Sequence, residues 1–159
     1  MQFSIRKATR EDADVILHFI RQLSEYEKLA DSVSATRELI LKFGFGERPC
    51  FEALLAENDD GEPLGMALYF YTFSTFLSRP TLYLEDLFVS PQSRANGVGK
   101  ALLRELVEIA RQRGCGRVEW AVLDWNEPAI RFYESLGANP VSGWTIYRLD
   151  GKNLAAFDI

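Results

Sequence analysis

The spacing of apolar residues changes along the chain, and this spacing predicts which segments are helices and which are strands. Residues 3–7 alternate between apolar and polar positions, as in a short strand. Thr9 to Asp12 reads T-R-E-D, a hydroxyl followed three residues later by a carboxylate, which resembles a helix-capping box. Apolar residues at helical spacing then predict a helix to about Leu29. A second helix is expected over about 35–43, ending at Gly44.

From residue 50 the pattern changes to runs rich in aromatic and β-branched residues, which indicate strands. Strands are expected over 50–57, 64–73, 81–89, 117–123 and 144–149. Two further helices are expected over 97–113 and from the capping residue Asn126 to Gly137. No repeat or long linker interrupts the sequence, so residues 1–159 are predicted to form a single α/β or α+β domain.

The charge balance narrows the class of partner. The net charge is −5, with 26% charged and 47% hydrophobic residues. Nucleic acids and anionic membranes require clustered cations, so neither is expected as a partner, whereas a cationic small substrate suits this balance. The N-terminal residues lack the apolar core of a signal peptide, and the longest apolar stretch, residues 66–77, is too short to span a membrane.

Candidate metal ligands and nucleophiles are few. Cys50 and Cys115 do not have the spacing of a metal site, and His18 is the only histidine. A zinc site and a histidine-based triad are therefore not expected, and no metal is predicted. Two cysteines without a disulfide framework favour a reducing, cytoplasmic location.

A glycine-rich loop, R-A-N-G-V-G-K, joins the strand over 81–89 to the next helix and suggests a phosphate site. A P-loop is disfavoured because Arg94 replaces its first glycine and Ala101 its final hydroxyl residue. A dinucleotide fold using Gly97, Gly99 and Asp124 remains an alternative, although its third glycine is missing. The pattern R-x-x-G-x-G also fits, and a tight turn without any ligand is a further alternative.

Longer motifs surround this loop. "LYLEDLFVSPQSRANGVGKALL" and "AVLDWNEPAIRFYESLGA" together resemble the GNAT superfamily of acetyl-CoA-dependent N-acetyltransferases, and "LSEYEKL" and "FGFGERP" are similar to its diamine-acetylating branch. The resemblance runs from about residue 2 to 150. It implies a GNAT fold, a mixed central sheet of about six to seven strands flanked by about four helices. It also implies acetyl-CoA as cosubstrate, a small-molecule amine as acceptor and a homodimer.

The resemblance further implies which residues bind the cofactor. Loop amides would hold the pyrophosphate, from Ala95, Asn96, Gly97, Val98, Gly99 and Lys100. The preceding strand would offer backbone groups to the pantetheine arm, from Leu87, Phe88 and Val89. Asn126 and Tyr133 would contact the cofactor from the other side, and Arg94 would approach its phosphates. The family usually has glycine in place of Ala95, and the methyl group is tolerable unless this residue needs a positive φ.

For the chemistry, the resemblance implies direct attack of an amine on the thioester. Glu85 would act as general base through water, and Tyr133 as general acid for the departing thiolate. An amide near Leu87 would stabilise the oxyanion. Glu85 and Asp86 are also substrate-binding candidates, but neighbours in a regular strand face opposite sides, so only a β-bulge would bring the two side chains together.

Acceptor specificity rests on fewer residues. Tyr26 and Glu27 match the substrate-binding residues of the first helix in the family. Ser74, Phe76 and Ser142 stand where the polyamine enzymes have an aspartate, a tryptophan and a glutamate, which favours a diamine or a lysine-like amino acid over spermine. The alternatives are protein or peptide amines as acceptors, a non-catalytic acyl-CoA-binding regulatory module, and a nicotinamide-binding oxidoreductase.

Overall fold

The structure is a computed structural model that describes residues 2–158. Among them are five strands, namely β1 (Phe3–Lys7), β2 (Glu52–Asn58), β3 (Pro63–Ser74), β4 (Arg79–Val89) and β5 (Arg117–Trp120). The α-helices are α1 (Ala13–Tyr26), α2 (Arg37–Phe45), α3 (Val98–Gln112), α4 (Glu127–Ser135) and α5 (Gly151–Ala155). Short 3-10 turns are η1 (Arg10–Asp12), η2 (Ala30–Ser32) and η3 (Pro91–Ser93). No helix in this part of the chain has both the length and the apolar character to cross a membrane.

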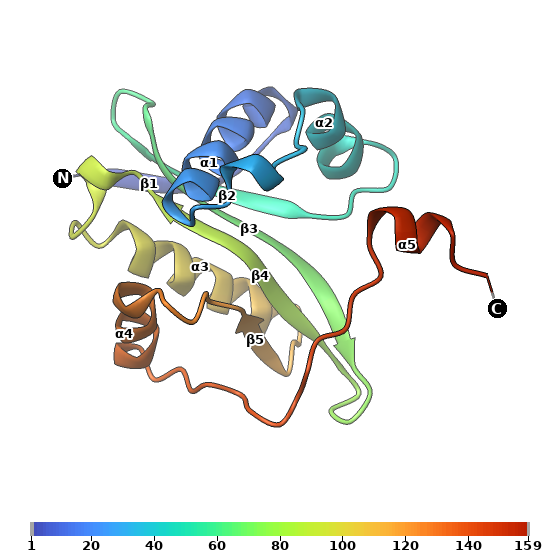
Figure 1. Ribbon diagram of the computed structural model, residues 1–159. Helices are drawn as coiled ribbons and strands as arrows, with labels where there is room; N and C mark the ends of the chain where they lie inside the picture. Colours follow the sequence, from blue (N-terminus) through green and yellow to red (C-terminus); the bar gives the residue numbers. More distant parts are fainter. Residues whose placement is uncertain (1, 159) are drawn as a thin grey trace. The chain divides into compact units, whose positions relative to one another are not determined.

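Contacts divide the chain into two units, Met1–Ala121 and Val122–Ile159. The first unit holds one sheet in the order β1-β2-β3-β4-β5 (Figure 1). The first four strands are antiparallel neighbours, and β5 runs parallel to β4 because α3 carries the chain back between them. The predicted mixed α/β sheet is therefore confirmed, with five strands in the described residues instead of six to seven.

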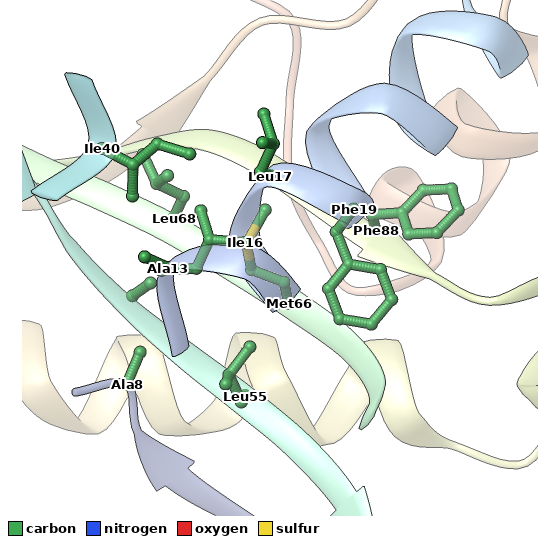
Figure 2. Close-up of a cluster of buried hydrophobic side chains, with 11 residues drawn as sticks. Ala8, Ala13, Ile16, Leu17, Phe19, Ile40, Leu55, Met66, Leu68 and Phe88 are labelled. Carbon is green, nitrogen blue, oxygen red and sulfur yellow. The ribbon is translucent and has the colours of Figure 1, made fainter. Parts of the chain in front are cut away.

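Helices cover both faces of this sheet, α1 and α2 on one face and α3 on the other (Figure 1). Figure 2 shows the core under α1, where Ile16 and Phe19 pack over Leu55, Met66 and Phe88. All five side chains are at most 4% exposed. Burying one such side chain contributes about 1.5–3 kcal/mol, so this cluster fixes α1 on the sheet.

A β-bulge interrupts the pairing of β3 with β4. Leu68 lies opposite Asp86 and Tyr69 lies opposite Leu84, so Glu85 is an extra residue on β4. An extra residue reverses the face to which the following side chains point. Strict alternation therefore does not hold at Glu85 and Asp86, because β4 has a bulge there.

The sequence predicted most helix ends to within a few residues. The capping box forms, since the Asp12 carboxylate accepts the Thr9 N–H at 2.7 Å. The same carboxylate accepts two bonds from the Arg6 guanidinium, at 2.8 and 2.9 Å, which ties β1 to the start of α1. Helix α1 ends at Tyr26 rather than near Leu29, because Lys28 takes a left-handed φ of +62°.

The second unit contains α4 and α5, and one strand prediction here is wrong. Residues 144–149 form no strand, and Trp144, Ile146 and Tyr147 are 81%, 84% and 92% exposed. High β-propensity alone does not make a strand, because the backbone groups also need a neighbouring strand. The strand expected over 117–123 ends at Trp120, and α5 was not predicted from the sequence.

Candidate active site

The glycine-rich loop leads directly into the first turn of α3. Ala95 and Gly97 both adopt left-handed φ, +63° and +82°, and Gly97 is the N-cap of the helix. The first intrahelical bond runs from the Ala101 N–H to the Gly97 carbonyl, at 2.9 Å. The amides at the start of a 15-residue helix lack intrahelical acceptors and lie at the positive end of its dipole. This combination favours an anion, as the sequence suggested.

Ala95 has a positive φ, and at a positive φ the methyl group of alanine is unfavourable. A left-handed residue other than glycine costs roughly 1–2 kcal/mol. A Cβ placed on Gly97 would meet no atom within 4 Å, so the need for glycine there lies in backbone conformation rather than space. The loop therefore has two left-handed positions, separated by Asn96, and only one of them is a glycine.

The end of β4 has an open edge beside this loop. Strand β5 pairs with β4 over Thr81–Leu84 only. From Glu85 to Val89, β4 has β3 on one side and, within residues 2–158, no strand on the other. An extended ligand could lie along this edge of residues 87–89, where the Val89 carbonyl already accepts a hydrogen bond from Arg94 Nε.

Carboxylates gather where the bulge meets the end of α1. Asp86 lies opposite Leu68, whose side chain belongs to the core under α1. Burial, followed by the negative charges of Glu85 and Glu27, raises the pKa of Asp86 to about 6. Burial also raises the pKa of Glu27, which caps the C-terminus of α1. Glu85 itself is exposed.

Tyr26 and Arg94 connect this acidic cluster with the loop. The guanidinium carbon of Arg94 lies 4.9 Å from the ring centroid of Tyr26 and 5.9 Å from that of Phe88. Arg94 Nε also donates to the Val89 carbonyl at 3.1 Å. The structure thus brings together the loop, the end of β4, the acidic pair and the end of α1, all within the first unit.

Two predicted residues belong to the second unit. Asn126 is buried at the N-cap of α4, and its side chain accepts the Ala129 N–H at 3.4 Å. Tyr133 is half-buried two turns later, on the same side of the helix, beside Phe132 with ring centroids 5.4 Å apart. The cap expected from the sequence is confirmed, and capping is compatible with a further contact to a ligand.

A hollow of about 240 Å³ lies at the other end of the sheet, beside α3. Its polar centre is Glu52, which pairs with Lys7 at 2.6 Å and Arg113 at 3.2 Å. The buried Tyr69 hydroxyl also donates to Glu52, at 3.2 Å. These groups pair with one another, so we assign the hollow a structural role.

The sequence predicted Asp86 as a substrate-binding residue. Strand alternation argued only that Asp86 and Glu85 face opposite sides of a regular strand and form no carboxylate dyad. In the structure Asp86 lies directly after the bulge, and burial, followed by the charges of Glu85 and Glu27, raises its pKa. The sequence signal was the rare adjacent acidic pair inside an otherwise apolar strand.

The chain is similar to several known proteins. Residues 17–138 match the sequence profile of the acetyltransferase (GNAT) family. Thialysine N-epsilon-acetyltransferase of Sus scrofa is 40% identical over 158 residues, covering 93% of this chain and 92% of that protein. L-ornithine N5-acetyltransferase of Arabidopsis thaliana is 43% identical over 113 residues, covering 70% and 50% of the two chains. Among solved structures, an integron cassette protein from the V. cholerae mobile metagenome has a TM-score of 0.81 and 28% identity, covering 98% and 96%.

Proposed function

Because this chain belongs to the GNAT family of acetyltransferases, we propose that it transfers an acetyl group directly from acetyl-CoA to a primary amine of a small cationic substrate. The observation that carries the proposal is the acidic cluster of Glu27, Glu85 and Asp86 beside the anion-binding loop. A cationic amine and an anionic cofactor require these opposite environments next to each other.

The residues present fit acetyl-CoA. The left-handed residues of the loop and the amides at the start of α3 suit a pyrophosphate. The cations of Arg94 and Lys100 would attract its negative charge. The open edge over residues 87–89 suits the amides of a pantetheine arm. Asn126 and Tyr133 remain predicted cofactor contacts on the strength of their motif. No metal takes part in the reaction as proposed.

Amine activation is the step that this acidic cluster explains. An alkylammonium group has a pKa of about 10.4 and must lose a proton before its nitrogen attacks the thioester. A general base works best when its pKa lies near the working pH, and the pKa of about 6 at Asp86 satisfies this condition. We therefore propose that Asp86 takes the proton, directly or through water, while Glu27 and the exposed Glu85 attract the ammonium.

This assignment differs from the one that the sequence suggested, in which Glu85 is the base and Asp86 a substrate ligand. Both residues stay in the proposal, with their roles exchanged. Tyr133 remains the proposed general acid, which protonates the departing thiolate, and the Leu87 amide the proposed oxyanion donor.

The proposed acceptor is a short diamine or a lysine-like amino acid. The relative that is 40% identical acts on thialysine by name, and the one that is 43% identical acts on L-ornithine. Phe76, at the position where polyamine enzymes have a tryptophan, is 94% exposed. It therefore builds no wall of a long channel within the described residues.

The test is thiol release from acetyl-CoA with diamines, polyamines, lysine, thialysine, ornithine and a peptide amine. We expect turnover to be highest with thialysine, ornithine or a short diamine. Turnover of the peptide alone would favour a protein acceptor. No turnover with bound acetyl-CoA would favour a regulatory module, and binding of NAD(H) instead of acetyl-CoA would favour an oxidoreductase.

We also propose that the protein is a cytoplasmic homodimer forming one domain per chain. Large apolar side chains of the second unit are exposed, which supports an interface with a second copy: Trp125, Leu136, Val141, Trp144, Ile146, Tyr147, Leu149, Leu154 and Phe157. Two free cysteines suit a reducing compartment. Sedimentation that gives the mass of one chain at working concentration would contradict the dimer.

A further inference from the structure

We infer that Arg94 is a positioning residue that couples the phosphate loop to the acceptor end of helix α1 through the ring of Tyr26. The inference rests on the proposed function, because that function makes the loop the cofactor site and the end of α1 the acceptor site. It gives Arg94 a second role, beyond that of one more cation for the cofactor phosphates.

Within residues 2–158, the Arg94 side chain contacts residues of β4 and α1. Its Nε donates to the Val89 carbonyl at 3.1 Å, its guanidinium covers the buried Phe88 ring at 5.9 Å, and it lies over the Tyr26 ring at 4.9 Å. The side chain therefore joins the start of the loop to the end of β4 and to the last residue of α1.

The backbone at Arg94 is held independently of these contacts. Its N–H donates to the Pro91 carbonyl at 3.3 Å, and its carbonyl accepts from Asn96 Nδ2 at 3.2 Å. Replacing the side chain should therefore leave the loop in place while removing the connection to α1. This separation makes the inference testable by substitution.

Tyr26 is the first of the two α1 residues predicted to contact the acceptor, and Glu27 follows it. A guanidinium plane over an exposed ring contributes about 0.5–1 kcal/mol, and the planar group orients the ring as well. A ligand in the loop that restrains Arg94 would also restrain Tyr26. Thermodynamic linkage makes the effect reciprocal, so a change at Tyr26 must alter binding in the loop.

The experiment is a double-mutant cycle read by calorimetric titration with coenzyme A, which needs no turnover. Tyr26→Leu should weaken coenzyme A binding about two- to five-fold, corresponding to the contribution of one exposed cation–π contact. In the Arg94→Ala background the same Tyr26→Leu change should have no measurable effect. Arg104→Ala, which removes an exposed arginine from α3, is the matched control and should change neither constant.

A second readout uses amine kinetics. Arg94→Ala should raise the KM for the amine about two- to five-fold at saturating acetyl-CoA while kcat changes little, and Arg94→Lys should not restore it because lysine has no planar group. Additive effects of the two substitutions on coenzyme A binding, or stronger binding in Tyr26→Leu, would overturn the inference. Absence of turnover with every amine would refute the proposed function only, since the calorimetric cycle would still decide the coupling.

Discussion

At the scale of single residues, the loop contains an alanine in a conformation that favours glycine. Ala95 has a φ of +63°, which costs roughly 1–2 kcal/mol, whereas glycine costs about 0.4–1 kcal/mol through the entropy of the unfolded chain. The first cost is larger. Ala95→Gly should therefore raise the free energy of unfolding by about 0.5–1 kcal/mol, measured by urea denaturation.

A matched control for this substitution lies in the helix that follows. Ala101 is in the first turns of α3, where glycine is unfavourable, so Ala101→Gly should lower the free energy of unfolding by about 1 kcal/mol. If Ala95→Gly also lowers it, the loop does not hold residue 95 in the left-handed region.

The pKa of Asp86 is raised to about 6 by burial and by two like charges, which gives a prediction for the pH dependence of activity. The ionised form is the one that accepts a proton, so kcat/KM for the amine should rise with pH through about 6. This rise forms the acidic limb of the pH profile. Removing a negative neighbour makes ionisation easier, so Glu27→Gln should move this limb to lower pH. Asp86→Asn should abolish the limb and most of the activity.

Two controls separate the possible bases. Glu25→Gln removes the same charge from an exposed position of α1, two residues earlier, and should leave the limb in place. Glu85→Gln should move the limb to lower pH but retain it. Loss of the limb in Glu85→Gln, with its retention in Asp86→Asn, would return the base assignment to Glu85.

At the scale of elements, the bulge shows why part of the site was hidden from the sequence. Leu82, Leu84, Asp86 and Phe88 occupy alternate positions, as if all four faced one side. In the structure Leu84 lies opposite Tyr69, while Phe88 belongs to the core under α1. An extra residue in the middle of an unbroken alternation leaves no trace in the pattern. The strand was thus predictable, but the face presented by Asp86 was not.

The junction of β1 and α1 depends on Asp12, which gives a second prediction of pH dependence. The Arg6 guanidinium holds the pKa of Asp12 below its usual value, with the Thr9 N–H as a further donor. Two charged hydrogen bonds of this kind contribute about 1.5–3 kcal/mol each before relaxation. Asp12→Asn should lower the free energy of unfolding by about 2 kcal/mol at pH 7.

The sign of this pH dependence follows from the depressed pKa. The stabilisation is fully present above the unfolded pKa of about 4 and disappears as pH falls through the folded value. The difference between wild type and Asp12→Asn should therefore be constant from pH 5 to 8 and shrink below pH 4 in urea titrations. Asp14→Asn is the control, since the pair with Arg37 is exposed and should contribute less than about 0.5 kcal/mol. A difference that persists to pH 2 would contradict the role of the carboxylate.

At the scale of the whole molecule, the sequence identified the family because its motifs are long. Apolar runs predicted most of the strands, and the mixed sheet followed from the family resemblance. Residues 144–149 show the limit of that method. "WTIYRL" has the composition of a strand, but the identity of its neighbour is a tertiary property that no local pattern contains. Asn126 and Tyr133 could be named only through their motif, because their spacing alone also fits an ordinary capped helix.

The second unit cannot be stable by itself, and this leads to a prediction for the complete chain. In residues 122–158 no apolar side chain is buried, and Asn126 is the one buried residue. Segments below about 40 residues rarely fold without a disulfide, a metal or a partner. We therefore expect the predicted single domain to unfold in one calorimetric transition, with equal calorimetric and van't Hoff enthalpies. If the chain is also a homodimer, its Tm should rise with protein concentration. A separate transition retained by a peptide of residues 122–159 would contradict the single domain, because that unit would then fold without the sheet.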